Sequence, residues 1–127
     1  MTCIPRDKMP QVPGTDRLLL YLSQCGVPYF SGDLPVSMVQ QRQCPDPFDP
    51  HKWQEAQPRR PILVSHDLVI VDGHHRFAWA LSQGWKSVPT LLILAPFERC
   101  RALLLEMPGT YRLNAGEDDW VGAPGTP

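Results

Sequence analysis

Five consecutive residues, Asp72-Gly73-His74-His75-Arg76, hold the side chains of this sequence that are best suited to chemistry. They lie where an apolar run gives way to helical spacing, so they predict a helix N-terminus. Free N–H groups and the helix dipole favour an anion at such a place. An Arg and two His in that turn suit a phosphate or a carboxylate. The alternative is structural: Asp72 caps the helix, Gly73 makes the turn, and the other three are solvated or paired with surface acids.

The segment before this loop has the pattern of a β-hairpin. Residues 62–64 and 68–71 are apolar runs, and the polar Ser65-His66-Asp67 between them is short enough for a hairpin turn. Residues 88–94 form another nearly continuous apolar run, typical of a strand buried on both faces. We expect strands near residues 61–65, 68–71 and 88–94 to share one sheet.

The segment after the loop changes to helical spacing. Phe77, Ala80 and Leu81 fall at i, i+3 and i+4, and Gly84 follows where a helix would end. We expect this helix to begin within two residues of His74.

Weaker patterns predict the remaining elements. These are a helix from residue 14 or 15 to 26, an edge strand at 27–30, a second strand at 34–39, a short helix at 49–57 and a last helix at 96–108. The first of these helices should bury Leu18, Leu19, Leu22 and Cys25, and the last should bury Phe97, Cys100, Leu103 and Leu104. Around the central sheet, the predicted core consists of Trp53, Leu63, Val69, Val71, Phe77, Leu81 and Leu92. The predicted fold class is therefore α/β, a small mixed sheet flanked by helices.

The length and composition suit one domain. The chain has 127 residues, of which 43% are hydrophobic, so it can bury a proper core. We expect a domain at residues 1–113 and a mobile acidic Gly/Pro tail at 114–127, in which Trp120 docks on the domain or on a partner. A net charge of −1 gives no general attraction to nucleic acid.

Targeting and redox features predict a cytoplasmic protein. The longest apolar run is far shorter than a bilayer span, and there is no signal-peptide pattern. The four cysteines show no Cys-x-x-Cys spacing, so we expect reduced thiols and no metal site.

The central stretch resembles the ParB/sulfiredoxin-like superfamily. The similar positions are Pro61-Ile62-Leu63-Val64, then Val69 to Arg76, then Gly84 and Val88-Pro89. The Asp-Gly-His-His-Arg variant is most similar to small ParB-like domains of phages and mobile elements and to the free serine kinase branch. The resemblance implies the same mixed fold.

The resemblance also implies roles for the loop. Gly73, His74 and His75 would offer backbone N–H groups to the phosphates of a nucleotide or of a phosphorylated substrate, and Arg76 would hold a phosphate through two bonds. Asp72 would hold a substrate hydroxyl, a Mg²⁺ ion or its own loop, and His75 would act as general acid or base. The implied cofactor is ATP or another nucleotide with Mg²⁺.

Two departures from the family pattern bear on activity. His74 stands where sulfiredoxins have their catalytic Cys, which argues against repair of sulfinic acids. Kinase relatives have an acid near the position of Gln40, and here only Asp33, Asp46 or Asp49 can substitute for it.

Three functions remain open from the sequence. The first is a nucleotide- or phosphate-binding domain with phosphoryl transfer or ATP hydrolysis. The second is a nucleic-acid-binding or nuclease-like accessory protein of a phage or plasmid, with DNA as the expected partner. The third is a non-catalytic interaction or inhibitor protein that binds another protein. The pair Arg59-Arg60 is either solvated or part of the rim of an anion site.

Overall fold

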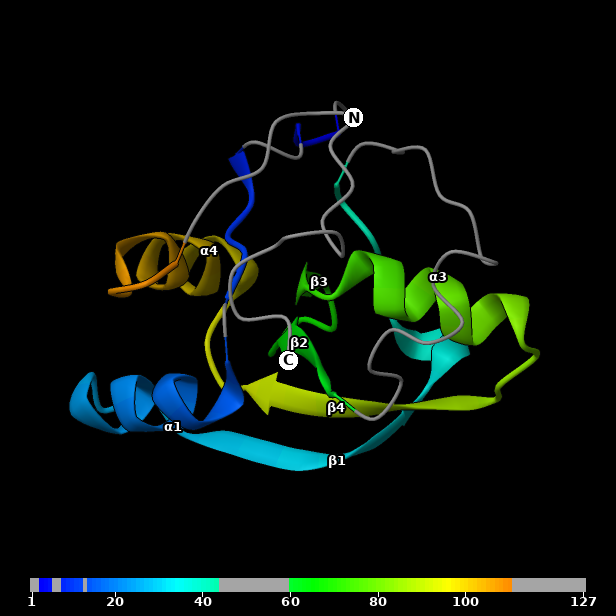
Figure 1. The fold of residues 1–127 in the computed structure, drawn as a ribbon, viewed down its shortest axis with the longest axis horizontal. Coiled ribbons are helices and arrows are strands. Elements are labelled where there is room, and N and C mark those ends of the chain that lie inside the picture. Colours follow the sequence, from blue (N-terminus) through cyan, green and yellow to red (C-terminus); the bar gives the residue numbers. More distant parts are fainter. Residues whose placement is uncertain (1–2, 6–7, 13, 44–59, 111–127) are drawn as a thin grey trace.

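A four-stranded mixed sheet lies at the centre of the computed structural model, which describes residues 3–5, 8–12, 14–43 and 60–110 (Figure 1). In chain order the elements are α1 (Thr15–Gln24), β1 (Tyr29–Pro35), the 3₁₀ helix η2 (Val36–Met38), β2 (Ile62–Ser65), β3 (Ile70–Asp72), α3 (His74–Ser82), β4 (Ser87–Ile93) and α4 (Phe97–Glu106). The strand order is β1-β4-β2-β3. The predicted fold class is confirmed.

The centre of the sheet is a hairpin followed by a crossover. β2 and β3 pair antiparallel, and α3 then carries the chain back so that β4 runs parallel to β2. The hairpin turn is closed by Leu68 N–H donating to Ser65 O at 2.9 Å and Ser65 N–H donating to Val69 O at 2.9 Å. The three strands and the helix start at His74 were all predicted, because each follows from a long apolar run or a clear change of period.

The outer strand β1 is longer than predicted. It pairs antiparallel with β4 over its whole length, from Tyr29 opposite Ile93 to Pro35 opposite Ser87. The predicted strand at 34–39 is wrong: its first two residues end β1 and the next three form η2. Gln40 makes only an isolated bridge to Val69.

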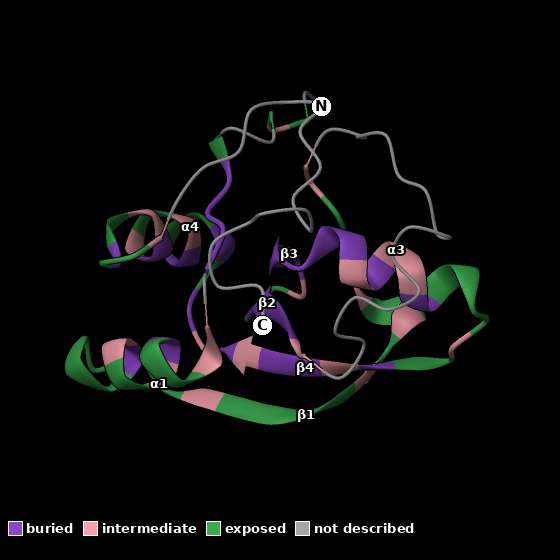
Figure 2. Ribbon diagram, viewed as in Figure 1, coloured by how far each residue is buried: buried purple, intermediate pink, exposed green. Residues whose placement is uncertain are grey.

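Apolar side chains pack on both faces of the sheet. One cluster joins Leu91 and Ile93 to α1 and α4, and the other joins Val88 and Leu92 to the α3 side, as alternation along β4 requires. Figure 2 shows the buried residues concentrated in β2, β3 and β4, whereas β1 is mostly exposed. Helices α1 and α4 therefore pack on one face of the sheet, and α3 packs on the other.

Several predicted core positions are wrong. Leu81 is 47% exposed, because it lies in the last turn of α3, away from the short strands under the first turns. Cys25 follows the end of α1 and is exposed, while Leu92 is only partly buried. The other predicted core residues around the sheet that the structure describes are buried, namely Leu63, Val69, Val71 and Phe77. The predicted burial in the first and last helices is confirmed for Leu18, Leu22, Phe97, Cys100 and Leu104. Two further residues of these helices, Leu19 and Leu103, are partly buried. Trp53 and the predicted helix at 49–57 lie outside the described residues, as does the tail at 114–127.

The cysteines do not all follow the prediction. Cys25 and Cys100 are free thiols, but Cys3 is disulfide-bonded, so the expectation of four reduced thiols is wrong for Cys3. Within the described ranges, no helix is both long and apolar enough to cross a bilayer.

Candidate functional site at the start of α3

The turn between β3 and α3 depends on a glycine. Gly73 is the N-cap of α3 and has a φ of 100°, a conformation that L side chains rarely adopt. A Cβ at this position would lie 2.9 Å from Ile62 Cγ2 and 2.8 Å from Arg76 Nη2. The turn therefore presses against the start of β2 and against the arginine of the same loop.

Arg76 lies over this turn. Its Nη2 donates to the carbonyl oxygen of Pro61 at 3.1 Å, and the residue is partly buried. This bond places the guanidinium beside the first turn of α3, where the helix dipole is positive. The arginine thus joins the start of α3 to the start of β2.

Asp72 binds a segment from the N-terminal part of the chain. Its Oδ2 accepts a hydrogen bond from Val12 N–H at 2.9 Å, and Arg60 donates to the carbonyl oxygen of the same Val12. Residues 9–12 are all buried. Asp72 therefore holds the segment at residues 9–12 against the loop, a structural contact that the sequence did not predict.

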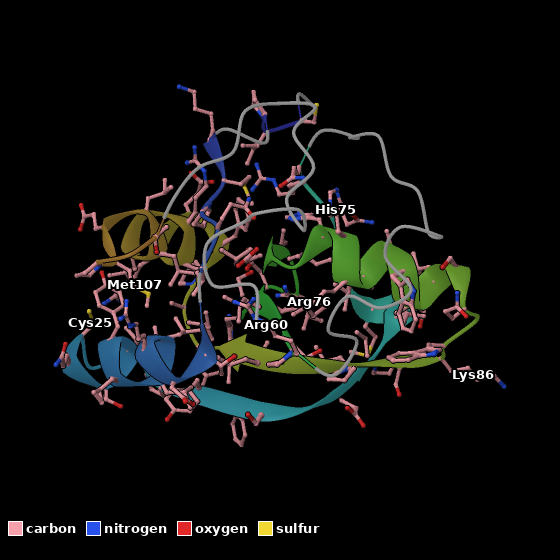
Figure 3. The ribbon with its side chains drawn as sticks, in the orientation of Figure 1. Cys25, Arg60, His75, Arg76, Lys86 and Met107 are labelled. Atoms are coloured by element: carbon pink, nitrogen blue, oxygen red, sulfur yellow. The ribbon has the colours of Figure 1, made fainter. Side chains whose placement is uncertain are left out.

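The two histidines of the loop are buried. His74 and His75 are 8% and 7% exposed, and the first turn of α3 contains no acidic residue. The helix is established at once, because Phe77 N–H donates to Gly73 O at 2.9 Å. In Figure 3, Arg60 and Arg76 lie on one side of this first turn and His75 lies on the other. A ligand beside both arginines would meet backbone N–H groups more readily than the His75 ring.

The five predicted residues share one turn, although His75 lies on the other side of it from Arg76, and the structure adds contacts that the sequence did not reveal. The structure adds Arg60 and the segment 9–12 to the loop, and makes Pro61 the acceptor for Arg76. The only sequence signals were the apolar Met9 and Val12 and the Arg59-Arg60 pair, neither of which identifies its partner.

Kinase relatives have an acidic residue near the position of Gln40, and three residues could substitute for it here. The one that the structure describes, Asp33, does not lie at this loop. Asp33 lies on β1 and lines a shallow cavity of about 420 Å³ with Trp85 and Lys86, which follow the far end of α3. Asp46 and Asp49 lie outside the described residues. Within the described ranges no group of three or more His, Cys, Asp or Glu side chains could hold a metal ion.

A second polar cluster joins the β2–β3 hairpin to α4. Asp67 accepts hydrogen bonds from the hydroxyl of Ser65 and, at 3.1 Å, from Phe97 N–H. Asp67 therefore caps α4 from a distant part of the chain. Nearby, burial and the charge of Asp67 raise the pKa of the Cys100 thiol to about 12. This cluster stabilises the fold and contains no ionised thiol at neutral pH.

Comparison with known proteins gives one structural likeness. No protein-family model matches the chain, and no curated protein matches it. The structure is similar to a solved one described as "Structure of the C2221 form of Pnob8-like ParB-N domain", with a TM-score of 0.48 and 14% sequence identity. The match covers 59% of this chain and 34% of that chain, so this chain spans about a third of the solved protein. The likeness concerns the fold alone.

Proposed function

We propose that the first turn of α3 binds the phosphate groups of a nucleotide or of a small phosphorylated substrate. The observation that carries this proposal is the position of Arg76, whose guanidinium is held beside Gly73 at the positive end of α3. The positive end of the α3 dipole favours an anion at this place. A phosphate there is stabilised by the helix and by the arginine together.

The contacts around Arg76 support a ligand of this kind. A guanidinium has five N–H donors in a planar fork, so it can hold the Pro61 carbonyl and a phosphate oxygen at the same time. Arg60 adds a second positive charge on the same side of the turn (Figure 3). Because the loop is largely buried, charges there are less screened than on an open surface.

ATP with Mg²⁺ is the cofactor that we propose. The N–H groups and arginines fit its phosphates, and Mg²⁺ is usually held by phosphate oxygens, waters and one or two carboxylates. Asp72 is the carboxylate nearest in sequence to the turn, and one of its oxygens holds Val12. Phosphoryl transfer or ATP hydrolysis would then depend mainly on positioning and charge neutralisation. Asp72 is the catalytic candidate, because the His75 ring lies on the other side of the turn from the two arginines.

Calorimetric titration of the variants Arg76→Ala and Arg76→Lys tests the proposal. The ligands are ATP, ADP, CTP and inorganic phosphate, each with Mg²⁺. Arg76→Ala should weaken binding by about 1.5–3 kcal/mol, as for a charged hydrogen bond, which is roughly 10- to 150-fold in affinity. Arg76→Lys should restore only part of it, because an ammonium lacks the planar fork.

Lys86→Ala is the matched control. Lys86 is an exposed cation beyond the far end of α3, so its loss changes the net charge equally without touching the turn. An equal loss of affinity in this variant would show that only overall charge matters. No binding by the wild type, with a large drop in thermal stability for Arg76→Ala, would make Arg76 structural and favour the interaction-protein hypothesis.

A further inference from the structure

The outer edge of the sheet at β1 is open to solvent. β1 is the first strand in the order β1-β4-β2-β3, so only one of its edges has a neighbour within the sheet. Residues 30–33 are all exposed, and Phe30 is 65% exposed. In Figure 1 the strand lies along the margin of the ribbon. Within the described ranges, no backbone hydrogen bond reaches this edge from another element.

Two hydrogen bonds show which backbone groups face outward. Leu94 N–H donates to Pro28 O at 2.9 Å, and Val36 N–H donates to Lys86 O at 3.0 Å, both in the register of the β1–β4 pair. Hydrogen-bonded pairs alternate along an antiparallel ladder, so the even-numbered residues of β1 face β4. The odd-numbered residues therefore direct their N–H and C=O groups outward. They are Tyr29, Ser31, Asp33 and Pro35, of which Pro35 has no N–H and offers only its C=O group.

The sequence of β1 is self-complementary about Gly32. If a second β1 strand pairs antiparallel with its centre at Gly32, all seven residues of both strands overlap and the outward backbone groups face each other. Phe30 then lies opposite Leu34 of the other copy, and Ser31 lies opposite Asp33. A register centred one residue later would place the two Asp33 carboxylates opposite each other, which is unfavourable.

We propose that two copies of this chain associate through their β1 edges, antiparallel and centred on Gly32. The partner is a second copy because this register gives each exposed group a suitable neighbour: Phe30 gains an apolar contact, and the Asp33 carboxylate meets a hydroxyl. The pairing joins two four-stranded sheets into one continuous sheet. The surface is separate from the first turn of α3, so the association does not depend on phosphate binding.

Charge variants at Ser31 test both the contact and its register. Ser31→Lys places an ammonium opposite each Asp33, in two equivalent pairs. Cross-strand charge pairs of this kind should tighten the dimer about two- to thirtyfold. Ser31→Asp places a second carboxylate opposite Asp33 of the other copy, in two equivalent pairs. This variant should weaken the dimer by a similar factor. In a register centred on Ser31, by contrast, Ser31→Lys would oppose lysine with lysine and weaken it.

Ser31→Pro tests the backbone bonds. It removes an outward N–H group from each copy while leaving the bonds to β4 in place. The variant should therefore fold but fail to dimerise. Gln83→Lys is the control for charge, because it adds the same ammonium at an exposed site next to α3. Its dimerisation should equal that of the wild type.

Sedimentation equilibrium over a range of protein concentrations supplies the dissociation constants, and circular dichroism confirms that each variant is folded. We expect a reversible dimer whose affinity follows the order Ser31→Lys, wild type, Ser31→Asp, with Ser31→Pro monomeric. A wild type that stays monomeric at every concentration would overturn the proposal. So would a Ser31→Pro variant that dimerises as well as the wild type, or a Ser31→Lys variant that dimerises less well.

Discussion

Replacing Gly73 by alanine should destabilise this protein more than the same change at Gly26 or Gly84. All three glycines have positive φ, but only Gly73 is closely surrounded by other atoms. The backbone there has a φ of 100°, which costs a residue with a Cβ about 1–2 kcal/mol. The added Cβ would also lie 2.9 Å from Ile62 Cγ2 and 3.1 Å from Ile62 Cα. Both atoms belong to the start of the central strand, so they cannot give way easily. Such overpacking costs about 1–3 kcal/mol more.

Gly84→Ala is the matched control. Gly84 has a φ of 74°, but a Cβ there would meet nothing within 4 Å. It should therefore pay only the backbone cost of about 1–2 kcal/mol. The difference between the two variants isolates the clash at the turn.

Urea unfolding followed by circular dichroism measures both variants. We expect a total loss of about 2–5 kcal/mol in unfolding free energy for Gly73→Ala, and unchanged denaturant slopes if both variants unfold in two states. Equal losses in the two variants would mean that the turn is not packed against β2. The position of Arg76 beside Gly73 would then be wrong as well.

Four further predictions concern the core, the cap of α4 and the free cysteines Cys25 and Cys100. Leu63→Ala should cost about 2–5 kcal/mol, whereas Leu81→Ala, at a side chain that is 47% exposed, should cost under about 1 kcal/mol by urea unfolding. Asp67→Ala removes the acceptor for the first N–H of α4 and should lower stability by about 1 kcal/mol, with Asp67→Asn losing less. Because the pKa of Cys100 is raised from 9.0 to about 12, the unfolded thiol ionises before the native one. The contribution of Cys100 to the unfolding free energy should therefore be fully present below pH 9 and be lost as the pH rises toward 12. The Cys100→Val variant should lose less stability over this pH range. At pH 8 a thiol reagent should label the exposed Cys25 much faster than Cys100.

The sequence predicted the elements whose signals are local. The strands at residues 62–65, 70–72 and 87–93 follow from apolar runs, and the start of α3 follows from the change of period after Gly73. The five residues of the loop are contiguous, so their grouping required no knowledge of the fold.

The errors arise where distant segments decide the outcome. Helical spacing placed Leu81 on the same face as Phe77, but burial depends on how far the sheet extends beneath that face. The polar Ser31-Gly32-Asp33 has weak strand propensity, and pairing with β4 overrides it.

Long-range polar contacts were likewise beyond local patterns. Val12 meets Asp72 across 60 residues, and Asp67 meets Phe97 across 30. Propensity and periodicity carry no information about such partners, so the sequence could propose Asp72 as a functional group but could not show what it binds.

Titration of ¹⁵N-labelled protein with ATP and Mg²⁺, followed by NMR, tests the central claim most directly, because it reports where an anion binds. If the first turn of α3 is the phosphate site, the backbone amide signals of Gly73 to Arg76 should shift together, with the same dissociation constant as the Arg60 and Arg76 side-chain signals. Inorganic phosphate should move the same signals more weakly. Shifts confined to other parts of the chain, or none at saturating ATP, would contradict the claim.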